Sequence, residues 1–196
     1  MNAIADKSSV DAPGTRQFLR AGTADLHARV DACFAGGLAS RLAYGRYLVG
    51  MHRFAADHEI VVDALPRLSF WLAADLQQLR LTPLPPSGYR GRAADAEERL
   101  GWDYVMAGSS LGARYLVRGA QALGHDEDAG ARFLTRHAAS SDWSRVLERL
   151  EAYGDCAEAA RARLLQGARD AFLLVESCFQ RSFGAMPAPP IQEPAA

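Results

Sequence analysis

The chain has 196 residues, and its 22 Lys and Arg against 23 Asp and Glu give a formal net charge of −1 at pH 7. A chain of this length folds most simply as one domain. Its balanced charge gives no basis for expecting a nucleic-acid-binding protein. Hydrophobic residues make up 49% of the sequence, which is enough for a sizeable buried core.

The composition strongly favours helices. Ala occurs 37 times and Leu 23 times, whereas Val, Ile and Thr together occur 16 times. Ala and Leu have high helix propensity, and β-branched residues are restricted at χ1 in a helix. The sequence therefore predicts an all-α fold, a single-domain multi-helix bundle.

The cysteines and the apolar runs indicate the compartment. Cys33, Cys156 and Cys178 are widely spaced, and an odd number without a CxxC pair argues against a disulfide scaffold. No apolar run approaches the roughly 20 residues that a membrane helix needs. Residues 1–14 lack the apolar core of a signal peptide. We therefore expect a soluble, cytoplasmic protein that makes no membrane contact.

Apolar residues recur with a 3.6-residue period along most of the chain, which is typical of amphipathic helices. Taken in chain order, the predicted helices cover about residues 15–34, 40–58, 66–79, 93–123, 126–138, 142–153 and 155–183. The pattern thus predicts a bundle of seven or so helices, with one long helix in the middle of the chain.

Proline-rich and small-residue segments delimit the helical region. Residues 1–14 are polar and small and end in Pro and Gly, which predicts a flexible lead-in. Four prolines fall within residues 184–196, so we expect a disordered Pro/Ala-rich tail there. Residues 82–88 read Thr-Pro-Leu-Pro-Pro-Ser-Gly and are expected to form an extended linker. The predicted helical domain is therefore 15–183.

The long central helix contains an unusual pair of glycines. The segment from Tyr104 reads Tyr-Val-Met-Ala-Gly-Ser-Ser-Leu-Gly, so Gly108 and Gly112 lie about one turn apart. Each glycine inside a helix costs roughly 1 kcal/mol relative to Ala, and Gly/Ser pairs are common sites of kinks. Two explanations are open: close packing of a neighbouring helix, or the approach of a flat ligand to the backbone.

A second candidate lies in the first predicted helix. His27 shares a helix face with Arg20 and Thr23, which precede it by seven and four residues. Arg20 is two turns away, about 10 Å along the helix axis. A lone His on a helix is more often an exposed residue than a ligand. The combination matters here, because a cation at that distance could hold the carboxylate of a molecule whose centre contacts His27.

These segments together resemble the haem oxygenase family, in its bacterial biliverdin-producing branch. The segment Leu19-Arg-x-x-Thr-x-x-Leu-His27 is similar to the proximal helix of the family, whose His is the axial ligand of the haem iron. The segment from Tyr104 to Gly112 is similar to the kinked distal helix, whose glycines lie on the haem. Ala168-Arg-Asp-Ala-Phe-Leu-Leu174 resembles the late helix that closes the pocket. The resemblance covers about residues 15–183 and includes haem oxygenases associated with bacteriophytochromes.

The resemblance implies a set of site residues. His27 would be the axial ligand of the haem iron, and Arg20 would pair with a haem propionate, with Arg169 as a weaker candidate for that role. The implied binding residues are His27, Arg20, Thr23, Tyr104 and Arg169, and the implied catalytic residues are Gly108, Ser109 and Gly112.

The resemblance also implies a reaction. Haem would be both substrate and cofactor, cleaved with O₂ to biliverdin, CO and ferrous iron. Electrons would come from a separate reductase or ferredoxin, because the sequence has no dinucleotide-binding motif or Cys cluster. A bacteriophytochrome would be a partner that receives biliverdin.

Alternatives remain open at this stage. Ala107 and Ala113 stand where the family often has Glu and a further Gly, which leaves a non-catalytic haem carrier or sensor of the same fold. Thiaminase-like proteins resemble this fold and use a Cys nucleophile, so Cys178 is a further candidate. A di-iron bundle is not supported, because no His has an acidic residue three positions before it.

His137 falls near a predicted helix C-terminus, where His is electrostatically favoured.

Overall fold

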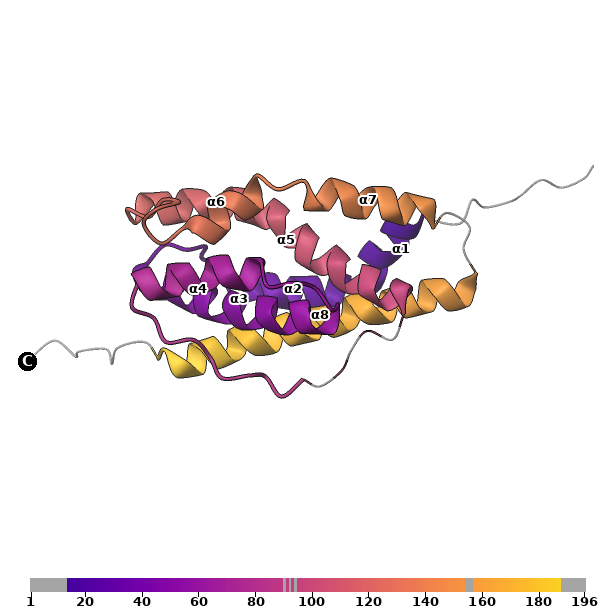
Figure 1. Ribbon diagram of the computed structural model, residues 1–196, viewed down its shortest axis with the longest axis horizontal. Helices are drawn as coiled ribbons and strands as arrows, with labels where there is room; N and C mark the ends of the chain where they lie inside the picture. Colours follow the sequence, from indigo (N-terminus) through magenta and orange to yellow (C-terminus); the bar gives the residue numbers. More distant parts are fainter. Residues whose placement is uncertain (1–13, 90, 92, 94, 154–156, 188–196) are drawn as a thin grey trace, which may run out of the picture.

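The computed structural model describes residues 14–89, 91, 93, 95–153 and 157–187, and these residues form eight helices and no strand (Figure 1). The helices are α1 (Thr15–Gly22), α2 (Ala24–Ala32), α3 (Arg41–Val61), α4 (Leu68–Gln78), α5 (Ala96–Ala122), α6 (Arg132–Ala138), α7 (Asp142–Ala152) and α8 (Glu158–Ala185). The predicted all-α class is confirmed. None of the helices is long and apolar enough to cross a membrane among the residues described.

The segment predicted as one helix at 15–34 forms two helices. Thr23 separates α1 from α2 with non-helical backbone angles, φ −121° and ψ 4°. Its hydroxyl donates to the carbonyl oxygen of Leu19 at 2.8 Å. At the same bend, Leu165 of α8 packs so closely on Gly22 that a Cβ there would lie 2.6 Å from its Cδ1. Side-chain bonding to the backbone and close packing on α8 thus explain the break.

Two buried carboxylates hold the starts of α4 and α6. Glu59 on α3 accepts hydrogen bonds from the backbone N–H groups of Arg67 and Leu68, at 2.8 and 2.7 Å. Asp75 on α4 likewise accepts from the N–H of Phe133, at 2.8 Å. The first N–H groups of a helix have no partner inside the helix, and a carboxylate there also favours the helix dipole. These bonds join α3, α4 and α6 into one unit.

Helices α5 and α8 form the centre of the bundle and cross at two glycines. A Cβ on Gly101 would overlap the carbonyl oxygen of Leu164, and a Cβ on Gly167 would overlap the carbonyl oxygen of Glu98. The two backbones therefore touch directly, which only glycine allows. Beyond this crossing α5 runs away from α8 towards α6 (Figure 1).

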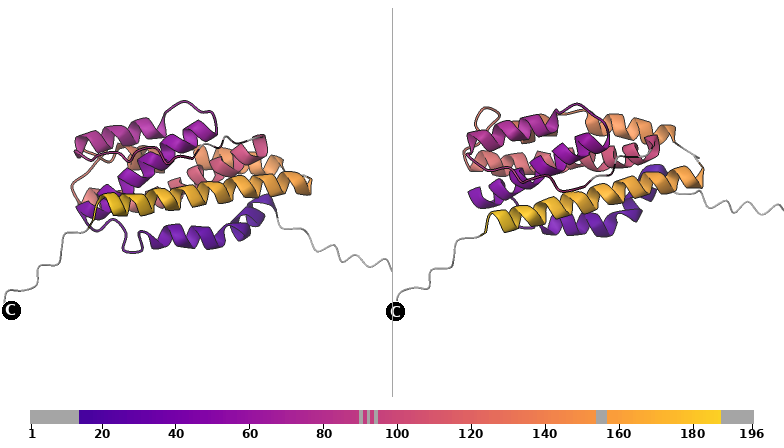
Figure 2. Two further views of the ribbon diagram at one scale, coloured as in Figure 1. Left: turned by 90° about the horizontal axis from the view of Figure 1, so that it is seen from below. Right: turned by 60° about the horizontal axis from the view of Figure 1, so that its bottom comes forward.

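Helices α1 and α2 lie on one side of α8, and α4 lies at the opposite side of the molecule (Figure 2). A two-point ion pair, Arg29 to Glu176 at 3.0 and 2.5 Å, holds α2 on α8. Both α2 and α5 pack on α8, yet no Cα of α2 lies within 8 Å of a Cα of α5, and all residues of both helices are described. Helices in direct contact have axes about 8–10 Å apart, so α2 and α5 are not packed on each other.

The ends of the helical region differ slightly from the prediction. Helix α8 continues to Ala185, so the predicted boundary at 183 falls inside a helix. The segment 82–88 has no regular structure, as predicted for a linker. Most of the predicted lead-in at 1–14 and of the predicted tail at 184–196 lies outside the described residues.

Candidate functional site

His27 presents an oriented imidazole on α2. Its side chain is 61% exposed, and its Nδ1 lies 3.0 Å from Oδ2 of Asp31, one turn along the helix. Its ring also meets Phe172 of α8 edge-on, with centroids 5.6 Å apart. In the neutral imidazole a carboxylate beside Nδ1 favours the tautomer with its proton on Nδ1, and Nε2 is then the nitrogen that can bind a metal. Asp31 is not among the site residues predicted from the sequence, although its i, i+4 spacing from His27 is visible there.

Gly108 and Gly112 on α5 are not required by the packing of the protein. Among the residues that the structure describes, a Cβ on Gly112 would have no heavy atom within 4 Å, and a Cβ on Gly108 would lie 3.5 Å from Trp143, an ordinary contact. At Gly101, by contrast, a Cβ would overlap backbone atoms of α8. Helix packing therefore explains Gly101 but not the pair that the sequence singled out. Of the two explanations left open by the sequence, close packing of a neighbouring helix is therefore not supported for that pair.

Large apolar side chains near Gly112 are exposed. Leu111 is 36% exposed and Tyr115 is 77% exposed. Residues 111, 112 and 115 share one face of α5. Exposed apolar surface of this kind commonly marks a binding surface, and here it surrounds a position without a side chain.

Two cations of α1 act on the same region of α5. Burial raises the pKa of the Tyr104 phenol above its usual value, and the positive charges of Arg16 and Arg20 oppose this rise. The Tyr104 ring lies 5.6 Å from that of Trp143, and the Arg16 guanidinium lies 5.7 Å from the same Trp143 ring. One turn before Gly108, the site thus has a cationic end that suits carboxylates.

Two of the predicted binding residues serve the bend between α1 and α2. Arg169 on α8 donates to the carbonyl oxygen of Gly22 at 2.5 Å and lies 3.7 Å from Oδ1 of Asp25. Thr23 is 2% exposed, and its hydroxyl is bonded to Leu19. Thr23 thus stabilises the bend between α1 and α2, and its part in ligand binding stays a prediction.

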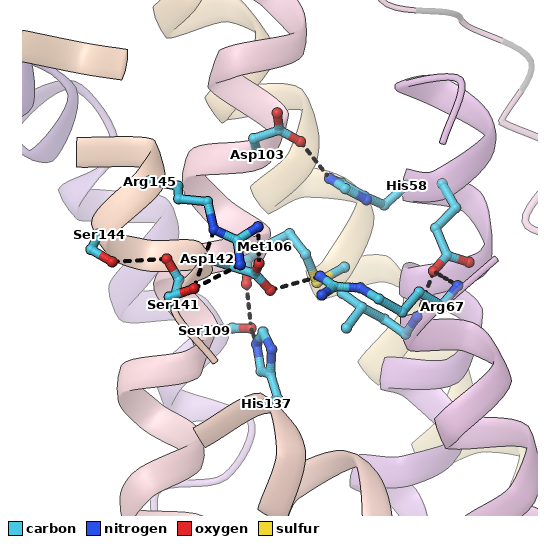
Figure 3. Close-up of polar contacts among 12 residues, drawn as sticks. His58, Arg67, Asp103, Met106, Ser109, His137, Ser141, Asp142, Ser144 and Arg145 are labelled. Atoms are coloured by element: carbon cyan, nitrogen blue, oxygen red, sulfur yellow. Dashed lines mark hydrogen bonds and ion pairs between the residues drawn. The ribbon is translucent and has the colours of Figure 1, made fainter. Parts of the chain in front are cut away.

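Ser109 is bonded on the side of α5 that faces α6. Its Oγ donates to the carbonyl oxygen of Met106 at 2.7 Å and lies 2.8 Å from Nε2 of His137 (Figure 3). Ser109 can therefore accept a further hydrogen bond but has no proton left to donate. Burial lowers the pKa of His137 to about 4. His137 does lie near the C-terminus of α6, but the desolvation of its buried imidazole outweighs the favourable effect of the helix dipole on its charged form.

A separate cavity of about 240 Å³ is lined in part by His58, Asp103, Met106 and Arg149. Figure 3 shows the first three of these side chains. Met106 is about 200° around the helix from Gly108, so the cavity lies on the opposite face of α5 from the glycines. Arg149 donates to Asp103 at 2.8 Å. Burial raises the pKa of Asp103, but the bonds with His58 and Arg149 outweigh it and bring the pKa below its usual value.

Cys178 does not have the properties of a nucleophile. It is fully buried, and burial raises the pKa of its thiol to about 12. A catalytic Cys acts as the thiolate, so this alternative loses its chemical basis. Cys156 lies outside the described residues. Within the part of the chain that is described, no group of three His, Cys, Asp or Glu side chains could hold a metal ion.

Comparison with known proteins decides which family has this arrangement. The heme oxygenase family model matches residues 88–181. The chain is 31% identical over 191 residues to heme oxygenase PigA of Pseudomonas aeruginosa, covering 86% of this chain and 96% of that protein. The chain belongs to the haem oxygenase family. Its fold also matches a haem oxygenase from Neisseria meningitidis, solved with NO and CO bound, with a TM-score of 0.68 and 27% identity over 93% of this chain and all of that one.

Family membership fixes the general function. This haem oxygenase is an oxidoreductase with haem as its substrate, and its function is haem cleavage. The chemistry inferred from the sequence and that of the matched proteins therefore agree.

Proposed function

We propose that this haem oxygenase binds haem between α2 and α5, with His27 as the axial ligand, and cleaves it with O₂ to biliverdin, CO and ferrous iron. The contrast between Gly101 and Gly112 carries the proposal. The packing of α8 requires the first glycine, whereas no heavy atom of the described residues lies within 4 Å of a Cβ built on the second. A flat ligand lying on α5 explains why that space is kept.

The proximal residues hold the iron ligand in one protonation state. When bound, the haem iron supplies the redox chemistry that activates O₂. Asp31 keeps the His27 proton on Nδ1 and so leaves Nε2 free to ligate. The ion pair between Arg29 and Glu176 holds α2 on α8, which fixes the helix that carries the ligand.

The cationic end positions the haem in its plane. Arg20 is proposed to pair with a propionate, because a planar guanidinium suits a carboxylate. Tyr104 remains a neutral hydrogen-bond donor there, since its pKa is raised. Arg169 acts indirectly, through its bond to the carbonyl oxygen at the end of α1.

The distal residues leave room and supply no side-chain acid. Gly108 and Gly112 let the backbone of α5 approach the porphyrin. Ser109 can accept a hydrogen bond from a water molecule, but its own proton is bonded to the carbonyl oxygen of Met106. Protons for the reaction therefore come through water rather than from this serine.

The proposal also includes an electron donor, an acceptor of biliverdin and a cellular location. We propose an external reductase or ferredoxin as the electron donor, because the sequence has no motif for a redox cofactor of its own. A bacteriophytochrome is the proposed acceptor of biliverdin on the family resemblance alone. The free thiols of Cys33 and Cys178 support a reducing, cytoplasmic location.

A haem titration tests the proposal. The wild-type protein should develop a Soret band with one equivalent of haem, and His27→Ala should lose the histidine-ligated spectrum. His125→Ala is the matched control, because His125 stacks on Tyr44, 5.1 Å away, rather than lying on α2. An unchanged spectrum in His27→Ala would place the ligand elsewhere.

Turnover separates the enzyme from the haem carrier or sensor. With ascorbate or a reductase system added, the Soret band should decay to the absorption of biliverdin while CO is released. The alternative, motivated by Ala107 and Ala113, predicts a stable haem spectrum and no CO.

A further inference from the structure

His137 is a buried imidazole that the proposed mechanism does not use. It lies on α6 with no exposed surface, and its ring is stacked on Phe133 with centroids 4.9 Å apart. Its Nε2 meets Ser109, but its Nδ1 is buried and has no hydrogen-bond partner in the described part of the chain. A buried polar atom without a partner destabilises a protein. An apolar side chain would avoid this, so the imidazole calls for a reason.

The available protons determine the direction of each hydrogen bond. Ser109 donates its only hydroxyl proton to the carbonyl oxygen of Met106, so it must accept from His137. His137 therefore carries its proton on Nε2 and leaves Nδ1 bare. The result is a chain of two bonds that runs from α6 through Ser109 to the backbone of α5 (Figure 3).

The second bond of this chain lies beside Gly108 within α5. A serine that bonds to a carbonyl three residues back competes with the helical hydrogen bond and tends to bend the helix. Met106 and Ser109 flank Gly108, and α5 changes direction along its length as it approaches α6 (Figure 1). The donor on His137 holds the Ser109 hydroxyl in the rotamer that makes this bond.

We propose that His137 is a positioning residue that fixes the bend of α5 through Ser109, and so sets how closely the distal backbone lies over the haem. The inference rests on the proposed role of α5 as the distal helix. His137 touches neither haem nor substrate in this account. It acts by keeping one serine rotamer in place.

Three substitutions separate this role from simple packing. His137→Met keeps most of the volume and removes the donor. His137→Gln keeps an amide donor that can reach Ser109, so it should restore the wild-type behaviour. Ser109→Ala removes the other partner, and the double variant tests whether the two residues act as one unit.

The first readout uses the haem-free protein. Nitrogen NMR of the imidazole should show His137 as the Nε2–H tautomer in the wild type, with a slowly exchanging ring proton. In Ser109→Ala this proton should exchange faster. An Nδ1–H tautomer in the wild type would overturn the proposal.

The second readout uses azide as a probe of the distal side of the ferric haem complex. His137→Met and Ser109→Ala should each change the azide dissociation constant at least threefold and in the same direction. The double variant should show no further change in this constant. The azide dissociation constant of His137→Gln should be within twofold of the wild-type value. Effects that multiply in the double variant, or an unchanged constant in His137→Met, would show that His137 only packs.

Two controls keep the outcomes distinct. Should His137→Met fail to fold, His137→Phe retains the stack on Phe133 and also lacks the donor. A wild-type protein without a Soret band would contradict the proposed haem site, whereas the tautomer measurement does not depend on haem. Normal haem binding with azide constants that do not change would contradict only the role of His137.

Discussion

Oδ2 of Asp31 lies 3.0 Å from Nδ1 of His27, and the two side chains are 68% and 61% exposed. An exposed pair of this kind contributes at most about 1 kcal/mol to stability, because water and salt screen it. The pair therefore serves the protein through its effect on the imidazole rather than through stability. Once a ligand covers the imidazole, the same carboxylate sets the tautomer and the donor strength of the remaining nitrogen.

Replacing Asp31 should therefore impair the reaction without unfolding the protein. We expect Asp31→Ala to change the free energy of unfolding by less than about 0.5 kcal/mol and to lower turnover roughly 10- to 100-fold. The turnover of Asp31→Asn, which keeps an acceptor oxygen, should lie between that of Asp31→Ala and that of the wild type. The iron–histidine stretching frequency of the ferrous complex measures the effect directly and should fall in Asp31→Ala. Asp25→Asn on the same helix is the control, and an equal effect there would contradict a specific role.

Gly112 should respond to substitution in two opposite ways. Gly112→Ala should stabilise the haem-free protein by about 0.5–1 kcal/mol, because Ala has the higher helix propensity and its Cβ meets no atom. The same Cβ should weaken haem binding, and Gly112→Leu should block it. Urea unfolding of the haem-free protein and haem titration measure the two effects. Unchanged haem affinity in Gly112→Leu would return this glycine to a purely structural role.

Gly101 should show the reverse behaviour in the haem-free protein. A Cβ there would overlap the carbonyl oxygen of Leu164 across the α5–α8 crossing. We expect Gly101→Ala to lower the free energy of unfolding by about 1–3 kcal/mol, the usual cost of overpacking, or to prevent folding. Urea unfolding of Gly101→Ala, compared with that of Gly112→Ala, is the measurement. Equal stability of the two variants would contradict the distinction between a packing glycine and a ligand glycine.

The contrast between these glycines shows which features a local sequence pattern can predict and which it cannot. The pattern around Gly108 and Gly112 was visible because it interrupts an apolar helix and matches a family motif. Gly101 and Gly167 were missed, because each is required by backbone atoms more than 60 residues away along the chain, and no local pattern records such a contact. The helix periodicity identified most helices for the same local reason, since each helix buries one face, but the helix predicted at 126–138 begins only at Arg132.

The break between α1 and α2 illustrates the second limit. Thr23 fits a helical pattern as well as a break, and the bend depends on packing against Leu165 and on the bond from Arg169 to the end of α1. Local propensity carries no information on these tertiary contacts. Asp31 is different, because its spacing from His27 was available in the sequence and was overlooked.

Removal of Arg20 should weaken haem binding in a salt-dependent way. Arg20 is exposed and its charge reaches Tyr104, so we expect Arg20→Gln to raise the haem dissociation constant roughly three- to tenfold at low ionic strength. The difference from the wild type should shrink in high salt, because screening weakens the attraction between the guanidinium and a propionate. Arg80→Gln, an exposed cation that follows α4 on the opposite side of the molecule from α1, is the control. A salt-independent loss would point to altered packing instead.

Acid should destabilise the haem-free protein partly through His137. Its pKa is about 4 in the folded protein against 6.5 for the ordinary group, chiefly because of burial; Arg67 adds to this and Asp142 opposes it. As the pH falls through 6.5 the unfolded chain binds a proton that the folded chain refuses, so stability is present above pH 6.5 and is lost towards pH 4. The difference between these two pKa values corresponds to about 3 kcal/mol in the free energy of unfolding. Urea unfolding at pH 7, 6, 5 and 4.5 should show a steeper loss for the wild type than for His137→Met, which retains all other titrating groups. Parallel curves for the two proteins would mean that the imidazole is protonated in the fold as easily as in the unfolded chain.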